Sequence, residues 1–454
     1  MIETTLSQVA RMMQSGIYGT YDADTLVKGV VIDSRQVREG SMYVPMIGQK
    51  ADGHSFIEQV AQKGAALAFW QKDHVPYPEC IPLILVDNTQ EALARLAKAY
   101  LETLDVKVIG VTGSNGKTSC KDMLFSVFSQ ERKTQKTQGN RNNEIGLPLT
   151  VLDLDADTEI AVLEMGMENK GEIAALCDIA APDIAIITTI GSAHMENLGS
   201  KLDIAQAKCE IYDGLKDGGL FIYNKDCPEI DEVLSSRRLD RDKKIMSFGK
   251  EGDIRIVSPI AYDNEGIRFL TSVMDAEISL RALGDHQAMN ALPCILAAKY
   301  EGLDDASILK GLAQLEMTKM RTQLVSAKKA RILDDSYKSN PESARAAIDT
   351  LMELPGTRHI AVLGDMLDLG KEENELHARI GAYAKEKGVD ELFAFGPLSK
   401  HTADQFGNWF ETKDEIVNHL LPYLEEDAVI LIKGSRAMSM DSIVADLTGG
   451  CKNV

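Results

Sequence analysis

The segment from residue 106 to residue 128 constrains the fold of this chain more than any other feature. An apolar, β-branched run, Val106–Val111, leads into a glycine-rich turn that ends Gly116-Lys117-Thr118, and apolar residues at helical spacing follow. In such a strand–turn–helix unit, backbone N–H groups and the helix N-terminus attract phosphates. The lysine reaches the terminal phosphates, and the threonine hydroxyl can hold Mg²⁺. The sequence therefore predicts a nucleotide-binding α/β unit.

The spacing of the loop identifies a shorter form of this motif. The usual eight-residue form would need glycine at position 111, where this chain has Val111. The loop is therefore Thr-Gly-x-x-Gly-Lys-Thr, running from Thr112 to Thr118. A Gly-Lys-Thr triplet is common by chance, but rarely falls between a buried strand and an amphipathic helix. We expect the ATP-contacting residues here to be Gly113, Ser114, Asn115, Gly116, Lys117, Thr118 and Ser119.

Length and composition limit the class of protein. A chain of 454 residues is expected to form about three domains. The net charge of −20 argues against nucleic acid or an anionic membrane surface as the main partner. The seven cysteines include no Cys-x-x-Cys pair, which is typical of reduced thiols in a cytosolic protein. No apolar run approaches the ~18 residues of a membrane span, and the N-terminus lacks a signal sequence, so we expect a cytoplasmic protein.

Strand and helix patterns alternate along the chain, which favours an α/β fold. Divisions near residues 103 and 318 predict three domains, 1–103, 104–318 and 319–454. Helices are expected from Thr89 to about Leu104 and over Gln287–Tyr300, with a β-rich stretch at Ile254–Leu280. Besides Val106–Val111, the predicted strands are Val30–Ile32, Met42–Val44, Ile160–Leu163, Ile184–Ile190, Leu220–Tyr223, Ala330–Leu333, His359–Leu363, Leu392–Phe395 and Val429–Ile432.

Polar residues follow directly on many of these strands. In open α/β sheets, ligands bind outside the carboxyl ends of the strands, so the pattern predicts a cleft between the middle and last domains. The residues concerned are Gly113–Thr118, Glu164, His194, Asp334-Asp335, Gly364-Asp365 and Lys433-Gly434-Ser435-Arg436.

Taken singly, these candidates have both functional and structural interpretations. Glu164 could complete a Mg²⁺ shell or be a solvated strand-end carboxylate. His194 could ligate a metal or orient a phosphate, although a lone loop histidine is more often a surface residue. Arg321, at the expected hinge, could reach the transferring phosphate or be a surface charge. The spacing around Lys208 favours a surface lysine.

An amide-rich segment follows the phosphate loop. Asn140, Asn142 and Asn143 lie among glycines before Pro148, where turn chemistry could explain one or two of them. Three suit a loop that binds a polar ligand. Farther along, Asn340-Pro341 predicts a helix cap and first turn.

Six motifs in order give the chain a resemblance to the Mur ligase family that runs nearly from end to end. They are Gly113-x-x-Gly116-Lys117-Thr118, the segment from Gly139 to Thr150, Leu163-Glu164-Met165-Gly166, Asp335-Ser336-Tyr337…Asn340-Pro341, Leu363-Gly364-Asp365-Met366 and Lys433-Gly434-Ser435-Arg436. The resemblance implies an ATP-dependent ligase that adds D-alanyl-D-alanine to UDP-N-acetylmuramoyl-tripeptide through an acyl phosphate. It implies a central phosphate-loop domain with a parallel sheet, flanked by an N-terminal UDP-binding α/β domain and a C-terminal Rossmann-like domain.

The resemblance also implies roles for individual residues. Lys117 and Thr118 would bind ATP phosphates and Mg²⁺. Glu164, His194 and a carbamylated Lys208 would serve a two-metal site. The remaining ATP contacts would be Asn290 on the adenine side, Arg321 on the γ-phosphate and Asp335 on the ribose.

For the substrates, the resemblance implies a UDP site with the signatures Asp33-Ser34-Arg35 and Asp52-Gly53-His54. The other substrate-binding candidates are Asn140, Asn142, Asn143, Lys433, Ser435 and Arg436. The expected partners are thus ATP, the UDP-linked tripeptide and D-alanyl-D-alanine, bound by a monomer.

Four positions depart from the family pattern. Lys338-Ser339 stands where Asn-Ala is usual, Cys120 where threonine is common and Gln287 where asparagine is common. A kinase or simple ATPase on the same loop is one alternative function, and a binding protein descended from a ligase is another. The sequence leaves open whether the tripeptide ends in lysine or meso-diaminopimelate.

Overall fold

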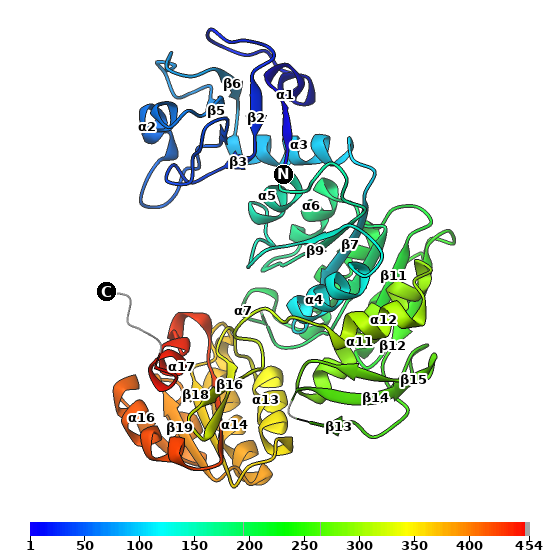
Figure 1. The fold of residues 1–454 in the computed structure, drawn as a ribbon, viewed down its shortest axis with the longest axis vertical. Coiled ribbons are helices and arrows are strands. Elements are labelled where there is room, and N and C mark those ends of the chain that lie inside the picture. The colour runs from blue at the N-terminus through cyan, green and yellow to red at the C-terminus, as the bar shows by residue number, and fades with distance from the viewer. Residues whose placement is uncertain (194, 264, 450–454) are drawn as a thin grey trace.

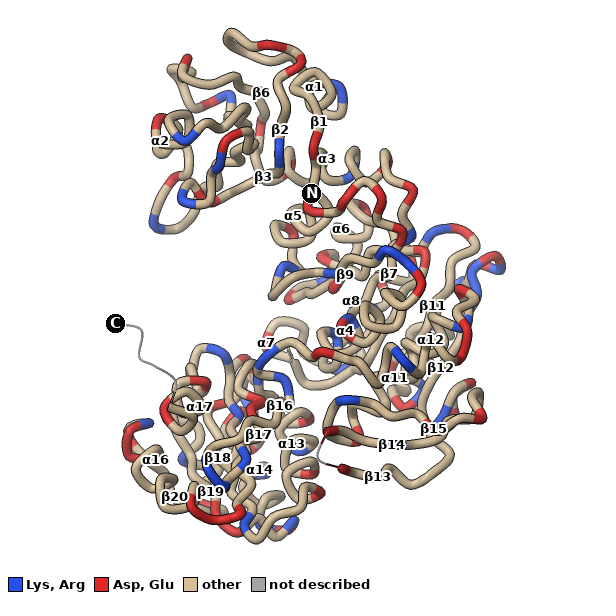
Figure 2. The backbone as a smooth tube through the Cα atoms, in the orientation of Figure 1, with Lys and Arg blue, Asp and Glu red and all other residues tan. Residues whose placement is uncertain are grey.

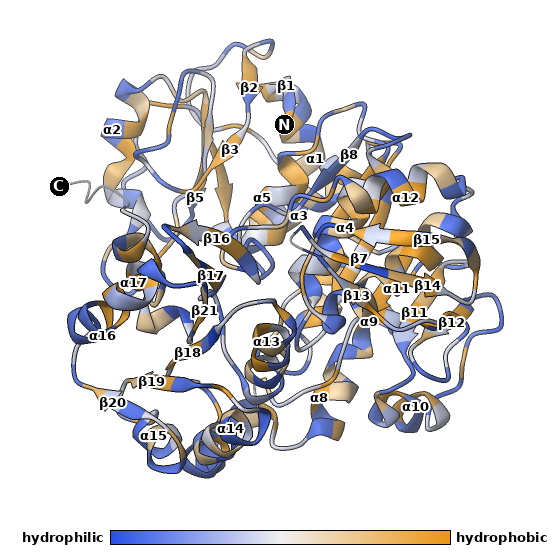
Figure 3. Cartoon of the chain, turned by 60° about the horizontal axis from the view of Figure 1, so that its bottom comes forward, coloured by the Kyte–Doolittle hydropathy of each residue, from blue (hydrophilic) through white to orange (hydrophobic). Residues whose placement is uncertain are grey.

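The computed structural model describes residues 1–193, 195–263 and 265–449. The chain is arranged in three successive parts, with the N-terminal part at the top of Figure 1, the central part below it and the C-terminal part at the bottom. Acidic and basic residues are distributed over all three (Figure 2). The strands are mostly apolar, whereas the helices show both colours (Figure 3), which is the pattern of sheets buried under amphipathic helices.

The N-terminal part contains two small sheets. The antiparallel pair is β1 (Glu3–Thr5) with β2 (Leu26–Lys28), and the parallel sheet has the order β3 (Val30–Val31), β4 (Met42–Tyr43), β5 (Leu67–Gln71) and β6 (Leu83–Val86). Its helices are α1 (Leu6–Met13), α2 (Ile57–Gln62) and α3 (Thr89–Leu101), with a short 3-10 turn at Gly53–Phe56. Asn88 caps α3 by accepting hydrogen bonds from the N–H groups of Gln90 and Glu91.

The central part is built on a six-stranded parallel sheet. Its order is β12 (Lys244–Phe248), β11 (Leu220–Asn224), β10 (Ile184–Ile187), β7 (Lys107–Thr112), β9 (Ile160–Glu164) and β8 (Thr134–Lys136). The chain leaves β7 toward β9 and β8 and later returns on the other side at β10, so β7 lies at a switch point where ligands bind. Separate apolar cores cover the two faces.

Helices and a second sheet complete this part. The helices are α4 (Lys117–Phe128), α5 (Gly146–Leu152), α6 (Glu172–Ile179), α7 (Met195–Leu198), α8 (Lys201–Lys208), α9 (Glu210–Asp213), α10 (Pro228–Ser235), α11 (Asp285–Tyr300) and α12 (Asp305–Ala313). The β-rich stretch predicted from the sequence forms the antiparallel sheet β13 (Ala261–Tyr262), β14 (Ile267–Thr271) and β15 (Met274–Leu280).

The C-terminal part is a second doubly wound sheet. Its order is β16 (Gln323–Ala327), β17 (Ala330–Asp335), β21 (Ala428–Lys433), β18 (Arg358–Gly364), β19 (Glu391–Phe395) and β20 (Asn408–Phe410), with only β16 antiparallel to its neighbour. Its α-helices are α13 (Pro341–Glu353), α14 (Glu373–Lys387), α15 (Lys400–Gln405), α16 (Lys413–Leu420) and α17 (Asp441–Leu447), and they pack on both faces.

The predicted strands and helices are confirmed, with ends that differ by a few residues. The prediction lacks β1, β2, β5 and β6 in the N-terminal part, and also β8, β12, β16 and β20, which are short strands at the edges of the two large sheets. An edge strand has one unpaired side and less apolar surface to bury, so its hydrophobic pattern is weak.

The expected domain divisions fall in connections between sheets. α3 ends at Leu101 before β7, and α12 ends at Ala313 before β16. On this basis we propose domains 1–103, 104–318 and 319–454. Within the described residues, no helix has the length and apolar character needed to cross a membrane.

Asn340 links α13 to the central part. Its side-chain oxygen caps α13 by accepting a hydrogen bond from the Ser343 N–H (2.9 Å). Its side-chain nitrogen donates to the Asn115 oxygen in the phosphate loop (2.8 Å). One amide thus both begins a helix and joins two parts of the chain.

The two roles can be separated with matched variants. Asn340→Ala removes both contacts and is expected to destabilise the C-terminal part by about 1 kcal/mol through loss of the cap. Asn340→Asp keeps the oxygen that accepts from the Ser343 N–H and from the Asn115 amide (3.3 Å), and loses only the donation to the Asn115 oxygen, so it should lose less than half of that stability. Urea unfolding followed by Trp409 fluorescence, in a Trp70→Phe background, measures the difference. Equal losses in both variants would contradict a capping role.

Candidate active site

The phosphate loop is shaped by two close backbone approaches. Gly113 (φ +149°) and Gly116 (φ +83°) adopt conformations that favour glycine. A Cβ on Gly113 would lie 1.9 Å from the Thr188 hydroxyl, and one on Gly116 would lie 2.3 Å from the Asn290 side-chain oxygen. The loop is also hydrogen-bonded to the end of β10, because the Ser114 N–H donates to the Thr189 carbonyl (2.8 Å). These contacts hold the loop at the carboxyl edge of the sheet.

A cavity of about 620 Å³ opens in front of this loop. Its walls come from the central part and the C-terminal part together, so the cleft predicted from the sequence is confirmed. The predicted site residues that line it are Ser114, Asn115, Gly116, Lys117, Thr118, Ser119, Asn140, Asn142, Asn143, Glu164, Arg321, Ser435 and Arg436.

Glu164 is a buried carboxylate held by two polar side chains. It ends β9 and is 3% exposed. The Thr118 hydroxyl donates to one carboxylate oxygen (3.0 Å), and the Asn142 amide donates to the other (2.9 Å). A hydroxyl and a carboxylate side by side are oxygen ligands of the kind that Mg²⁺ prefers. The solvated interpretation of Glu164 is therefore wrong.

Two lysines of the central part, Lys117 and Lys208, have pKa values below the ordinary value for lysine. Burial, with the charge of Lys338, lowers the pKa of Lys117 to about 8, although Glu164 opposes this. Lys117 donates to the Gly113 carbonyl (2.6 Å). Lys208 is 1% exposed, and burial and then the charge of Lys117 hold its pKa well below the ordinary value. The expectation of a surface lysine at position 208 is therefore wrong.

Arg321 reaches the phosphate loop from the other side of the cleft. Its guanidinium lies over the Tyr337 ring (4.1 Å to the centroid), and one nitrogen donates to the Thr118 hydroxyl (3.4 Å). Its Nε atom is buried and has no hydrogen-bond partner among the described residues. A donor aimed into the site without a partner suits an anionic ligand.

A second cavity of about 350 Å³ adjoins the loop on its other side. It is lined by Asn290 and Asp335, and also by His286, Asn224 and Lys433. The buried Lys433 amine donates to the Asp335 carboxylate (2.6 Å) and to the Lys338 carbonyl (2.8 Å). Lys433 therefore lies beside the nucleotide-side candidates, whereas Ser435 and Arg436 line the larger cavity.

Several predicted residues lie elsewhere. Asp33, Ser34 and Arg35 belong to the N-terminal part and line neither cavity, and Arg35 is paired with Asp33 (2.7 Å). Asp365 is buried and accepts hydrogen bonds from the Ser399 N–H and hydroxyl (both 2.7 Å), which is a structural role. His194 lies outside the described residues.

Other residues of the site were missed from the sequence. Thr188 and Thr189 follow β10 and hold the phosphate loop, and their position after a strand could have indicated them. Lys338 was noted only as a departure from a family pattern, yet it lines both cavities.

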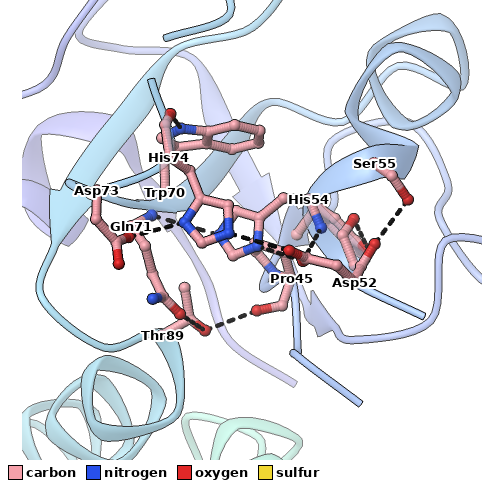
Figure 4. A network of polar contacts seen from close by, with 11 residues as sticks. Pro45, Asp52, His54, Ser55, Trp70, Gln71, Asp73, His74 and Thr89 are labelled. Carbon is pink, nitrogen blue, oxygen red and sulfur yellow. Dashed lines mark hydrogen bonds and ion pairs between the residues drawn. The ribbon is translucent and has the colours of Figure 1, made fainter. Parts of the chain in front are cut away.

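The N-terminal part contains a separate polar network around His54 (Figure 4). Asp52 lies beside two imidazoles, those of His54 and His74, which stack on each other with ring centroids 4.0 Å apart. It accepts from His54 Nδ1 (2.7 Å) on one oxygen and from His74 Nε2 (3.0 Å) on the other. His74 Nδ1 also contacts the Asp73 carboxylate (2.8 Å). The hydrogen bonds to Asp73 and Asp52 raise the pKa of His74, and burial lowers the pKa of His54.

These ligand atoms of Asp52, His54 and His74 lie within 4.8 Å of one another, a spacing that could hold a metal ion. The hydrogen bonds around these residues favour protonated ring nitrogens over a bound metal ion. The Gln71 N–H points at His54 Nε2 (3.4 Å), which places the proton of a neutral His54 on Nδ1, the atom that a metal would need. His74 contacts a carboxylate through each nitrogen, which suits an imidazolium.

Family profiles match the three parts of the chain in order. They are described as "Mur ligase family, catalytic domain" (residues 26–101), "Mur ligase middle domain" (111–298) and "Mur ligase, glutamate ligase domain" (320–436). Two curated relatives are named UDP-N-acetylmuramoyl-tripeptide--D-alanyl-D-alanine ligase. The one from Bacillus subtilis is 39% identical and the one from Escherichia coli 32%, and each alignment covers 98% of this chain and 99% of the relative.

Solved structures of Mur ligases resemble this chain over nearly its whole length. A crystal structure of MurF from Acinetobacter baumannii has a TM-score of 0.90 at 29% identity and covers 99% of both chains. MurF ligase from Thermotoga maritima, in complex with ADP, has a TM-score of 0.83 at 28% identity. That comparison covers 93% of this chain and 98% of the other.

The charged state of His74 in the N-terminal network gives a pH-dependent prediction. The pKa of His74 is raised in the folded protein, so the protonated imidazole stabilises the folded state. This contribution is fully present below the unfolded-state pKa near 6.5 and is lost as the pH rises through the pKa of His74 in the folded protein. His74→Gln should therefore cost about 1 kcal/mol at pH 6 and clearly less at pH 9. Urea unfolding followed by Trp70 fluorescence, in a Trp409→Phe background, measures this. A larger cost at pH 9 would contradict the imidazolium.

Proposed function

Since the chain belongs to the Mur ligase family, we propose that it joins D-alanyl-D-alanine to a UDP-N-acetylmuramoyl-tripeptide in an ATP-dependent reaction. The main support is the shared cavity in which Lys117, Thr118 and Glu164 of the central part face Arg321 of the C-terminal part. The product would be the UDP-linked pentapeptide precursor of peptidoglycan, which the cell wall needs for growth and division.

The chemistry proceeds in two steps. A carboxylate is a poor electrophile, so an oxygen of the tripeptide's terminal carboxylate first attacks the γ-phosphorus of ATP, and ADP leaves. The dipeptide amine then attacks the carbonyl carbon of the acyl phosphate. The bond from that carbon to the phosphate oxygen breaks, phosphate leaves and the nitrogen gives up a proton. No covalent enzyme intermediate forms, so no serine or cysteine nucleophile is required.

The cavity supplies positive charge for the first step. Lys117 and Arg321 would neutralise the phosphoryl group during its transfer, which is the main requirement of phosphoryl-transfer catalysis. The Thr118 hydroxyl and Glu164 carboxylate would hold Mg²⁺, which supplies further charge neutralisation on the phosphates. We include His194 among the ligands of a two-ion site.

Lys208 suits a carbamate. Its lowered pKa increases the fraction of the amine that is uncharged, and only an uncharged amine reacts with CO₂. The reaction forms an N–C bond, releases a proton and leaves a carboxylate-like group. This converts a buried amine, which has no ion pair among the described residues and lies near other cations, into an anionic oxygen ligand.

The two cavities divide the substrates. We place the adenosine of ATP in the smaller cavity, with Asn290 on the adenine side and Asp335 on the ribose, and the reacting groups in the larger one. Asn140, Asn142 and Asn143, with Ser435 and Arg436, would bind the peptide portion. Lys433 would act through Asp335. The UDP end would contact Asp33-Ser34-Arg35.

We also propose that the protein acts in the cytoplasm as a monomer. Its substrates are nucleotides and nucleotide-linked sugars of that compartment. Residues of one chain complete both cavities.

The ligase function is tested by phosphate release from ATP and Mg²⁺ with the UDP-linked tripeptide and D-alanyl-D-alanine added separately and together. Release only with both, and a pentapeptide by mass spectrometry, are expected. Lys117→Ala should lower the rate by about 100-fold or more, because a cation on the transferring group is lost. Release without the dipeptide would indicate a kinase or ATPase, and normal ligation by Lys117→Ala would overturn the mechanism.

Carbamylation of Lys208 is tested by removing CO₂. Ligation by the wild type should fall severalfold in CO₂-free buffer and return when bicarbonate is added. Lys208→Ala should be slower by about 100-fold, insensitive to CO₂ and partly restored by acetate, which can supply the missing carboxylate. A CO₂-independent wild type would show that the unmodified amine is the active form.

A further inference from the structure

Lys338 lies where the two cavities meet. It is half-buried in the turn between β17 and α13, and it is the lysine that lines both the larger and the smaller cavity. Its amine has no hydrogen bond or ion pair with any residue that the structure describes. Such an amine is available to a ligand.

The backbone around Lys338 is held on both sides. Tyr337 lies under the Arg321 guanidinium, and Asn340 caps α13 while pairing with Asn115 of the phosphate loop. The Lys338 carbonyl accepts a hydrogen bond from Lys433 (2.8 Å). The side chain therefore extends from a fixed turn rather than from a free loop, which is the condition for a preorganised contact.

Lys338 adds a positive charge to a region that already has several. Its charge acts on Lys117 and on Lys208, and that of Arg321 acts on Lys338. Burial and then Arg321 lower the pKa of Lys338, so an anion placed among these groups would offset both unfavourable effects. Glu164 is the nearby buried carboxylate, and Thr118 and Asn142 already occupy its oxygens.

We propose that Lys338 is a further catalytic residue, whose ammonium group contacts the phosphoryl group as it passes from ATP to the substrate carboxylate. This inference rests on the proposed ligase function. The γ-phosphate must lie near Lys117 and Arg321, which line the larger cavity, while we assign the adenosine to the smaller cavity beside it. Lys338 lines both cavities, so its ammonium group lies near the point at which the phosphoryl group leaves the nucleotide for the substrate carboxylate.

The test compares three variants. Lys338→Gln removes the charge, Lys338→Arg keeps it, and Lys319→Gln removes a charge from the exposed segment just before Arg321 as a matched control. Lys338→Gln should lower kcat for ligation by about 10- to 100-fold while KM for ATP changes by less than about threefold. Lys338→Arg should recover much of the loss, and Lys319→Gln should behave as the wild type.

A binding measurement separates catalysis from structure. Calorimetry gives the affinity for ADP with Mg²⁺, alone and with fluoroaluminate, which mimics the phosphoryl group in transfer. Lys338→Gln should leave ADP affinity unchanged and weaken the fluoroaluminate complex at least tenfold. Equal weakening of the ADP complex and the fluoroaluminate complex would indicate a structural residue and overturn the proposal. A lower thermal stability of Lys338→Gln that Lys338→Arg does not restore would have the same meaning. A raised KM for the tripeptide alone would assign Lys338 to the carboxylate substrate and also overturn it.

This measurement needs only the nucleotide. Failure of the wild type to ligate would contradict the proposed function, but the fluoroaluminate comparison would still decide whether Lys338 contacts a transferring phosphoryl group.

Discussion

Positive charge gathered around one cavity is the constraint on which most features of the site depend. Lys117, Lys208, Arg321 and Lys338 are close enough for their charges to act on one another, in surroundings where water screens them poorly. Burial and mutual repulsion both disfavour the charged amines. A bound polyanion such as ATP would relieve this unfavourable concentration of positive charge. The site is arranged for the charge of a reaction, not for the stability of the free protein.

The charged groups come from two sheets, and their assembly depends on how these sheets meet. The phosphate loop and Glu164 lie at the carboxyl edge of the central sheet, whereas Arg321 and Lys338 flank the first strands of the C-terminal sheet. Polar contacts hold the two edges together. Besides the pair between Asn115 and Asn340, the Ser192 N–H and hydroxyl donate to Glu342 in the first turn of α13 (3.2 and 2.8 Å). Leu283 and Tyr262 of the central part also pack against the apolar core of the C-terminal part, so the interface combines polar and apolar contacts. Such an interface suits a site that opens to exchange substrates and closes to exclude water from an acyl phosphate.

Much of this arrangement could be predicted from the sequence because it follows local rules. The apolar run, the two glycines and the lysine specify the phosphate loop, and Asn340-Pro341 specifies the start of α13. Since carboxyl ends of parallel strands share an edge, strand order was not needed to place Glu164 and Asp335 at ligand-binding edges.

Burial and pairing between distant segments could not be predicted. Lys208 has the helical neighbours of a surface residue, and only the packing of α8 in the central part makes it 1% exposed. Strands β8 and β16 are short and half-polar, and their partners specify them more than their own sequences do. No periodic pattern or turn motif indicated a functional role for Lys338. Its significance comes from two cavities that form only when both sheets are present.

Pairing separates several buried or half-buried lysines of this protein into two kinds. Lys433 is 1% exposed and has a carboxylate at 2.6 Å, and Lys121, equally buried, lies 3.5 Å from Asp122. In each, a neighbouring charge offsets much of the cost of burial, so no ligand is needed. Lys208 and Lys338 have no such partner among the described residues. An unpaired amine that is buried or half-buried is unfavourable unless a bound group or a chemical change compensates for it. Lys338 lines the cavities that we assign to ATP, and the proposed carbamate would compensate for the burial of Lys208. The same criterion explains why one strand-end lysine holds the fold of the C-terminal sheet while a lysine in the adjacent turn is free to take part in the reaction.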